Sequence, residues 1–279
     1  MPASDQARTL FRLIRESTGA LLAMRRNTVK HRPAPPASGL VLDVGAGQEA
    51  HPRADVVVDK YVVDDFERGA GLDLTKALVV ADGHALPFAD GAFRYAIAAH
   101  VVEHATDPVR FAAELSRVAD AGFVQVPSRE SELTFGWRFH PWLVDLEDGT
   151  LVFHPRGDAE APLGPFFHRV FTESTMLGVW FGANRDTWHH TLHWTGSLSV
   201  AVAGESRAPE TATLDVEHTV AVLADAGAHG PGDAARALLR CPVDAGVLEE
   251  SADRLVCASC SRSYPVAGGV PVLLAEAAA

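Results

Sequence analysis

The stretch that decides the fold is VLDVGAGQEA, residues 41–50, in which an apolar run reaches an acidic residue and then breaks into a glycine turn. Backbone N–H groups in such a turn can approach a ligand closely, because glycine carries no Cβ. Gly45, Gly47 and Ala50 have the spacing of the dinucleotide-binding fingerprint, whose last position can be alanine. The fingerprint alone is a weak signal, so the ligand of the turn has to be inferred from its surroundings.

Two neighbouring features argue against a pyrophosphate in this turn. Asp43 lies at the mouth of the apolar run, where its carboxylate would repel a pyrophosphate and attract a positively charged group. Only about eight residues separate Gly47 from the next apolar run, and Pro52 interrupts them. They leave little room for the helix whose N-terminus would hold a pyrophosphate. A nicotinamide-dependent oxidoreductase is therefore the weakest of the alternatives.

Apolar runs and a helical pattern alternate through the first half of the chain. The runs at 40–44, 55–58, 77–81, 95–99 and 122–126 are short and rich in β-branched residues, as buried strands are. Before the last run, Asp107 is a predicted N-cap and Pro108 a first helical residue. An apolar periodicity of 3.6 follows, carried by Val109, Phe111, Ala112, Leu115 and Val118. Such alternation predicts an α/β protein with a doubly wound, Rossmann-like parallel sheet covered on both faces.

Composition predicts further segments around this sheet. Residues 1–32 hold seven Arg or Lys and two Asp or Glu. They read as a basic amphipathic helical arm, although an organellar transit peptide has a similar composition. The apolar positions of the arm are Leu10, Leu13, Ile14, Leu21, Leu22 and Met24.

The main domain is predicted at 39–203, with an aromatic and His-rich insert at 128–190. Within it we expect a hairpin turn at Asp148-Gly149, a short helix over Thr172–Trp180 and one or two strands over Leu192–Val202. A linker region at 204–236 and a compact β-rich unit at 237–275 complete the chain.

Charge and cysteine usage limit the partners and the compartment. The formal net charge is -12, and without the basic arm it is -17. An acidic body makes nucleic-acid binding by bulk electrostatics unfavourable. No apolar run is long enough to span a membrane. Three cysteines, all after residue 240, fit a reducing cytoplasm rather than a disulfide framework.

Several segments together resemble the class I methyltransferases that use S-adenosylmethionine (SAM), in their small-molecule-like branch. The likeness is carried, in order, by VLDVGAG at 41–47, VVVDKY at 56–61, VVADGHALPFADGAFRYAIAAHVVEH at 79–104, the helix DPVRFAAELSRV and GFVQVPS at 122–128. Two positions depart from the family pattern: Glu49 stands where a third glycine is usual, and Arg94 replaces an acidic residue. Neither departure removes an implied ligand of the cofactor.

The resemblance implies a role for particular residues. Asp43, Gly45 and Gly47 would line the methionine end of SAM, and Asp59 would accept hydrogen bonds from both ribose hydroxyls. Asp82 would hold the adenine with the backbone around Gly83 and His84, walled by Leu86, Pro87 and Phe88. His100, after the fourth strand, would face the sulfonium, because ligands of open α/β sheets bind beyond the carboxyl ends of the strands.

The acceptor side is less determined. A base is needed only for a hydroxyl or a protonated amine, and His100 and His140 are the candidates. His100, Glu103 and His104 in HVVEH could instead ligate a metal or form a polar loop above the pocket. The aromatic and His-rich insert could form either part of the core or a lid over the acceptor. In a lid, His140, Trp142 and His168 would be the leading residues. The segment typical of exocyclic-amine methylation of bases is missing after the fourth predicted strand, and the main domain has no cysteine nucleophile for pyrimidine C5 methylation. Both of these nucleic-acid reactions are therefore disfavoured.

The C-terminal unit resembles the small zinc-ribbon family that activates tRNA and release-factor methyltransferases. CP at 241–242, CASC at 257–260 and YPVAGGVPVLL at 264–274 carry this likeness. Cys241, Cys257 and Cys260 are the candidate zinc ligands, but Asp244 stands where the family has a second cysteine. The unit could bind zinc through three thiolates and a carboxylate, or be a metal-free ribbon. In either form we expect it to dock on the main domain.

The leading hypothesis is thus methyl transfer from SAM to a small-molecule or glycan hydroxyl or amine. The main alternative is a non-catalytic SAM-fold adaptor that binds a protein partner through the ribbon.

Overall fold

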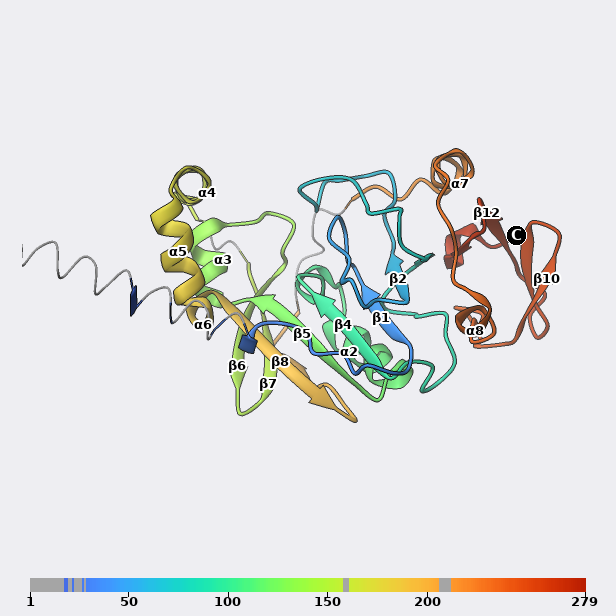
Figure 1. Cartoon of the computed structure of the whole chain (residues 1–279), viewed down its shortest axis with the longest axis horizontal. Coiled ribbons are helices and arrows are strands. Elements are labelled where there is room, and N and C mark those ends of the chain that lie inside the picture. Colours follow the sequence, from blue (N-terminus) through green and yellow to red (C-terminus); the bar gives the residue numbers. More distant parts are fainter. Residues whose placement is uncertain (1–17, 20–21, 23–26, 28, 158–160, 206–211) are drawn as a thin grey trace, which may run out of the picture.

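One ten-stranded sheet runs through most of the molecule (Figure 1). The computed structural model describes residues 18–19, 22, 27, 29–157, 161–205 and 212–279. Of the apolar residues expected in the N-terminal arm, Leu22 is exposed, and the other five lie outside the described residues. The strand order is β10-β11-β12-β13-β3-β2-β1-β4-β5-β8, and a separate sheet has the order β6-β7-β9.

The centre of the large sheet is the parallel core that the sequence predicts. It consists of β1 (Val41–Val44), β2 (Val56–Asp59), β3 (Leu78–Ala81), β4 (Tyr95–Ala99) and β5 (Ala121–Pro127). Going from β1 to β3 the chain moves to one side of β1, and β4 and β5 lie on its other side. This is the doubly wound order expected, closed at the edge by β8 (His189–Thr195), which pairs antiparallel with β5.

Most crossovers between the parallel strands lack the helices that were expected to cover the sheet. Only the β4–β5 crossover carries an α-helix, α2 (Pro108–Val118), preceded by the 3-10 turn η1 (Val102–His104). The segments between β1, β2, β3 and β4 contain no helix. Asp107 caps α2 as expected, since its side chain accepts a hydrogen bond from the N–H of Arg110. Val109, expected on the buried face of this helix, is instead exposed, because Pro108 and Phe111 occupy that face.

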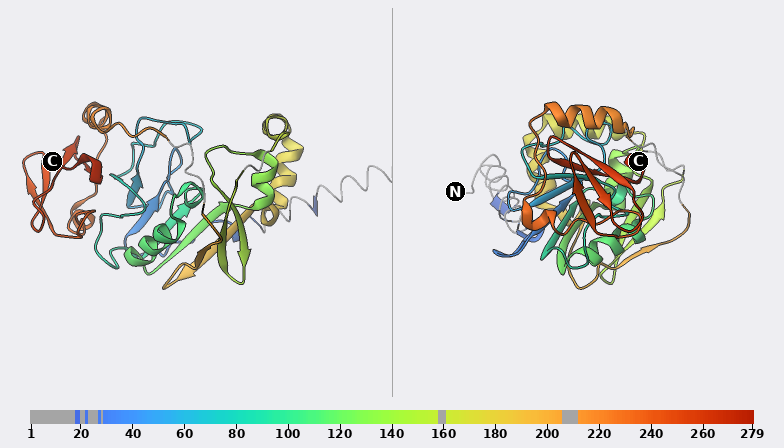
Figure 2. Two further views of the ribbon diagram at one scale, coloured as in Figure 1. Left: turned by 180° about the vertical axis from the view of Figure 1, so that it is seen from behind. Right: turned by 90° about the vertical axis from the view of Figure 1, so that its right-hand side faces the viewer.

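Elements from distant parts of the chain cover the two faces. Side chains alternate along the strands, so Val56 and Val58 belong to one core and Val57 to another. The first face packs against α2 and the small sheet of β6 (Trp142–Glu147), β7 (Thr150–Pro155) and β9 (Val200–Val202). The second face packs against α7 (Val216–Asp225), which lies on the opposite side of the sheet from α2 (Figure 2).

The C-terminal unit extends the main sheet. Its strands are β10 (Leu248–Ser251), β11 (Arg254–Cys257), β12 (Ser263–Ala267) and β13 (Val270–Leu273), followed by the 3-10 turn η2 (Ala275–Ala277). β13 pairs parallel with β3, Val272 opposite Val80. The segment expected as a linker holds α7 and the short helix α8 (Asp233–Arg236).

The insert between β5 and β8 folds largely as helices at the end of the molecule opposite the C-terminal unit (Figure 1). They are α3 (Arg129–Phe135), α4 (Gly164–Glu173), α5 (Thr175–Ala183) and α6 (Arg185–Trp188). The single helix expected over Thr172–Trp180 is wrong, because α4 ends before Ser174 and Ser174 caps α5. The hairpin turn is confirmed: Asp148 and Gly149 both have positive φ, 46° and 80°, between β6 and β7.

Candidate active site

A cavity opens at the carboxyl ends of β1 to β4, where an open α/β sheet places its ligands. It is bounded by the glycine turn, the loop after β2, the turn after β3 and the segment from His100 to Thr106. Of the expected cofactor-binding residues, those that line it are Gly45, Asp59, Asp82, Gly83, His84 and His100. Asp43 and Gly47 are not among its lining residues.

Glycine is required at the turn by both conformation and space. Gly45 and Gly47 have φ of 66° and 56°, in the left-handed region that side chains disfavour. A Cβ on Gly45 would lie 2.3 Å from Cγ2 of Val101. The turn is therefore packed directly under the segment after β4, and the cavity begins at its surface.

Asp43 supports the loop after the glycine turn and does not line the cavity. Its side chain is buried, 4% exposed, and its Oδ2 accepts a hydrogen bond of 2.8 Å from the N–H of His51. Burial raises the pKa of Asp43 to about 7, although the hydrogen bond from His51 opposes the rise. The carboxylate thus holds the loop that follows the glycines in place.

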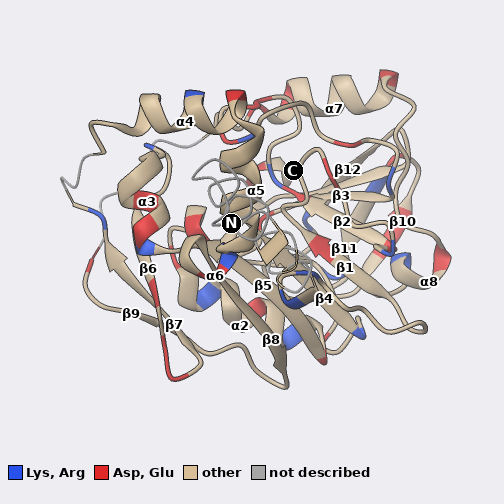
Figure 3. Cartoon of the chain, turned by 60° about the vertical axis from the view of Figure 1, so that its left-hand side comes forward, with Lys and Arg blue, Asp and Glu red and all other residues tan. Residues whose placement is uncertain are grey.

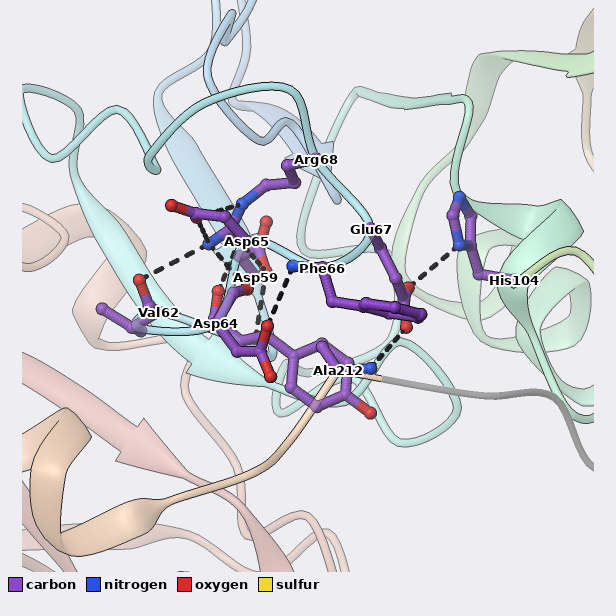
Figure 4. A network of polar contacts seen from close by, with 10 residues as sticks. Asp59, Val62, Asp64, Asp65, Phe66, Glu67, Arg68, His104 and Ala212 are labelled. Atoms are coloured by element: carbon purple, nitrogen blue, oxygen red, sulfur yellow. Dashed lines mark hydrogen bonds and ion pairs between the residues drawn. The ribbon is translucent and has the colours of Figure 1, made fainter. Parts of the chain in front are cut away.

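Asp59 ends β2 at the cavity wall. Its Oδ1 accepts a 3.1 Å hydrogen bond from the N–H of Tyr61, and Nη1 of Arg68 lies 3.4 Å away. Burial raises the pKa of Asp59, and the Arg68 guanidinium acts against it. Arg68 also pairs with Asp65 at 2.6 Å and bonds the carbonyls of the intervening loop, which it gathers around itself (Figure 4). A carboxylate held at the end of the second strand is suited to accept from paired hydroxyls.

Asp82 performs a similar role after β3. Its carboxylate accepts from Nζ of Lys60 at 2.8 Å, and from the N–H and Nδ1 of His84 at 2.8 and 2.6 Å. Burial would raise the pKa of Asp82, but the hydrogen bonds from His84 and Lys60 hold it well below its usual range. The group is an ionised acceptor at neutral pH.

The apolar wall differs from the one the family resemblance implies. Leu86 and Phe88 are buried in the core and do not line the cavity, and neither does Pro87. Phe111 of α2 lines it instead, packed so closely that a Cβ on Gly83 would lie 2.1 Å from its ring. Phe111 was recognised only as a core residue of the helix, because nothing in its spacing distinguishes a pocket wall from core.

The two candidate bases have different positions. His100 lines the cavity with a φ of 56°, and its Nε2 lies 3.1 Å from Oε1 of Gln125. His140 is buried at 5% exposure, does not line the cavity, and has its Nδ1 2.5 Å from Oε1 of Glu132. Burial lowers the pKa of His140 to about 3, so the ring is neutral at pH 7. The other lid candidates also lie away from the cavity: Trp142 is buried and donates to the carbonyl of Ala105, and His168 bonds the carbonyl of Phe135.

Several cavity residues were missed by sequence reasoning. Glu67, from the acidic loop after β2, accepts from the N–H of Ala212 at 2.8 Å and pairs with His104 at 2.9 Å (Figure 4). Both ends of this contact line the cavity, as do Lys60, Tyr61 and Asp64. The acidic run DDFERG at 64–69 was the available signal. Its pairing with a residue 145 positions later could not be seen in local sequence.

The C-terminal cysteines come together with Asp244. One ligand atom from each of Cys241, Asp244, Cys257 and Cys260 lies within 4.8 Å of the others. Sγ of Cys241 and Cys260 are 3.8 Å apart, and Sγ of Cys257 is 3.3 Å from Oδ1 of Asp244. Three thiols and a carboxylate at these separations fit the donor set of a tetrahedral zinc site.

Among the described residues, no helix is both long enough and apolar enough to cross a membrane.

Comparison with known proteins agrees with the central part of this description. Residues 42–122 match the model of the methyltransferase domain family. A protein of Bacillus halodurans C-125 described as a candidate methyltransferase is 20% identical over 38% of this chain and 51% of its own, with a TM-score of 0.28. The YcgJ protein of Bacillus subtilis is 20% identical over 40% of this chain and 51% of its own, also with a TM-score of 0.28.

A third solved structure is the complex between the Haloferax volcanii Trm112 methyltransferase activator and a candidate methyltransferase. The likeness is 16% identity over 62% of this chain and 89% of that one, with a TM-score of 0.35. This chain spans about half the length of the first two structures. No curated protein gave a significant match. The family match is confined to residues 42–122, which hold β1 to β4, α2 and the start of β5.

Proposed function

We propose that this protein transfers a methyl group from SAM to a hydroxyl or amine of a small molecule or glycan. The observation that carries the proposal is the cavity itself. It joins a glycine turn after the first strand, a buried carboxylate at the end of the second and a hydrogen-bonded carboxylate after the third. These are the donor and acceptor groups that an adenosyl ligand with an amino-acid tail requires.

Each part of SAM has candidate partners around the cavity. Asp59 would accept from the ribose hydroxyls, with Arg68 moving aside or staying as its counter-charge. Asp82, Gly83 and His84 would hold the adenine against the ring of Phe111. Gly45 would leave room for the methionine end, with Gly47 and Asp43 supporting the turn from outside the cavity.

Bound SAM supplies a methyl group on a positively charged sulfur, which a nucleophile displaces in line. His100, at the mouth of the cavity, is the group positioned to take a proton from the acceptor. His140 could assist only through the buried residues around it, because it does not reach the cavity.

The charge distribution of the molecule and the lining of the cavity support a small acceptor rather than a nucleic acid. Acidic residues are spread over several elements, including α3 and the β6–β7 turn, and are interspersed with Lys and Arg (Figure 3). Tyr61 and Phe111 line the cavity, and Phe139 stacks on His104, another lining residue, with ring centroids 5.4 Å apart. Aromatic walls with a few polar groups are typical of pockets for small ligands.

We also propose a zinc ion at Cys241, Asp244, Cys257 and Cys260, held in a ribbon-like unit that stabilises the domain at 39–203. The closeness of the four ligand atoms supports it. Protein purified without added metal should contain about one zinc per chain, and Cys257→Ser should lose it. Zinc-free wild-type protein with an unchanged unfolding midpoint would argue for a metal-free ribbon.

The test of the proposed activity is formation of S-adenosylhomocysteine (SAH) with a panel of acceptors. The panel should contain monosaccharides, nucleotide sugars, phenols and small amines, each incubated with SAM and the full chain. We expect acceptor-dependent SAH formation that Asp59→Asn reduces at least 10-fold at subsaturating SAM. SAM binding without turnover on any acceptor, together with a stoichiometric protein partner on purification, would favour the non-catalytic adaptor.

A further inference from the structure

Three side chains converge behind the acceptor side of the cavity. Glu103 and His104 come from the 3-10 turn after β4, and His140 comes from the loop before β6. One ligand atom from each lies within 4.8 Å of the other two. The imidazole centroids of His104 and His140 are 4.5 Å apart, and His104 lines the cavity.

Glu103 has no hydrogen-bond partner for either carboxylate oxygen, although it is only 1% exposed. Its nearest potential counter-charge is Nδ1 of His100, 3.4 Å from Oε1. Burying a carboxylate without a partner is strongly unfavourable, and buried charges in proteins are paired or coordinate a metal. Beyond this ion pair, Oε2 of Glu103 has no hydrogen-bond partner among the described residues.

The surrounding charges point to a cation. Glu67 and Glu132 contact the two imidazoles, so three carboxylates meet in this region. Arg156, 3.0 Å from Glu132, is the guanidinium paired with this group. Burial raises the pKa of Glu132 to about 8, so this carboxyl is largely neutral at pH 7. Burial also acts against ionisation of Glu103, but the hydrogen bond and charge of His100 lower its pKa overall, so Glu103 is the ionised group that a bound cation would neutralise.

Each imidazole has its Nδ1 beside a carboxylate oxygen. Nδ1 of His104 faces Glu67 at 2.9 Å, and Nδ1 of His140 faces Glu132 at 2.5 Å. Metal-binding histidines almost always donate one ring N–H to a carboxylate or carbonyl, which orients the other nitrogen toward the ion. Each glutamate is itself anchored, Glu67 by the N–H of Ala212 and Glu132 by Arg156. With Nδ1 of each ring beside a carboxylate, Nε2 is the nitrogen that would bind an ion.

We propose that Glu103, His104 and His140 bind a divalent first-row transition metal ion. Two nitrogens and one carboxylate oxygen make a donor set that leaves coordination positions open. Two ligands about 2.1 Å from a shared ion lie at most about 4.2 Å apart. The observed spread of up to 4.8 Å thus needs only a small closing movement.

The role of the ion rests on the proposed methyl transfer. A bound ion would be held next to the cavity by His104, and it would lower the pKa of an acceptor hydroxyl there, whose proton His100 would take. The acceptor oxygen then forms a bond to the methyl carbon of SAM. The electron pair of the broken carbon–sulfur bond stays on sulfur, which leaves neutral SAH. The inferred substrate class is therefore a hydroxyl compound.

The test is a titration of chelator-treated, full-length protein with Mn²⁺, followed by electron paramagnetic resonance of the free ion. Mn²⁺ favours oxygen and nitrogen donors over thiolates, so the cysteine cluster contributes little. We expect one Mn²⁺ site per chain, weakened at least 10-fold by Glu103→Gln and by His140→Ala. Glu130→Gln, nearby and exposed, and Cys257→Ser should leave it unchanged.

SAH binding of each variant, measured by calorimetry, separates this inference from the proposed function. Glu103→Gln that still binds SAH and loses Mn²⁺ supports the inference with the fold intact. Wild type that binds SAH but neither Mn²⁺, Co²⁺ nor Zn²⁺ outside the cysteine cluster overturns it and leaves the methyltransferase proposal standing. Mn²⁺ binding that depends on Glu103 without any SAH binding supports the metal site and contradicts the function.

Discussion

At the scale of residues, the glycine turn should be sensitive to a single added Cβ at Gly45. Gly45→Ala would place a Cβ 2.3 Å from Cγ2 of Val101 at a φ of 66°. The left-handed conformation costs about 1–2 kcal/mol and the overpacking about 1–3 kcal/mol more. We expect Gly45→Ala to lower the free energy of unfolding by about 2–5 kcal/mol in urea denaturation.

Gly91→Ala is the matched control for that substitution. Gly91 has nearly the same φ, 61°, with nothing within 4 Å of an added Cβ. It should cost only the conformational part, about 1–2 kcal/mol. Equal costs at both positions would show that the turn is not packed against Val101 as described.

Asp43 gives stability a dependence on pH. Its pKa is about 7 in the folded protein and 3.8 in the unfolded chain, so between these values the unfolded state has released a proton that the folded state keeps. Stability therefore falls as pH rises through this window. Relative to Asp43→Asn, the wild type should lose about 2 kcal/mol between pH 5 and pH 8. Urea denaturation of both proteins at the two pH values checks this, and parallel pH profiles would contradict it.

Individual residues were predictable where strand geometry determines their place. Asp59 ends a buried strand, Asp82 and His100 directly follow one, and all three line the cavity. Asp43 precedes the end of its strand and points into the loop instead, toward His51. Residues such as Glu67 and His140 depend on contacts between distant segments, which periodicity does not encode.

At the scale of elements, the pairing of β13 with β3 joins two regions that seemed separate. Val272 is fully buried opposite Val80, whereas Val247 of the same unit is 55% exposed. Val272→Ala should lower the free energy of unfolding by about 2 kcal/mol, because it removes buried methyl groups and leaves a cavity. Val247→Ala should change it by less than about 0.5 kcal/mol. Equal, small effects in chemical denaturation would mean that β13 is not part of the core.

The strands of the main sheet were readable because buried parallel strands are short, continuous apolar runs. The docking of β13 was not, since its partner lies about 190 residues earlier and each strand is equally apolar. The absence of helices between β1 and β4 was predictable only in part. The first crossover is too short for a long helix, but the later crossovers gave no such indication. α7 was missed because it lies in a segment that seemed to be a linker.

For the whole molecule, continuity of the sheet implies one cooperative unit. All five tryptophans lie between residues 137 and 194, and all three cysteines lie after residue 240. Tryptophan fluorescence therefore reports on the segment from Trp137 to Trp194, and thiol reactivity reports on the C-terminal unit. The two urea transitions should coincide. Thiols that become reactive at clearly lower urea would show that the C-terminal unit unfolds by itself.

The central claim is that the cavity beside β1, β2 and β3 binds an adenosyl cofactor through Asp59. Calorimetric titration of the full chain with SAH tests it most directly, with NADH as the competing ligand and Asp65→Asn as the control. Asp65 also pairs with Arg68 but does not line the cavity.

We expect micromolar SAH binding in the wild type and Asp65→Asn, at least 10-fold weaker binding in Asp59→Asn, as the loss of about 1.5–3 kcal/mol of charged hydrogen bonding implies, and none of NADH. SAH binding that is absent, or that Asp59→Asn leaves unchanged, would contradict the account.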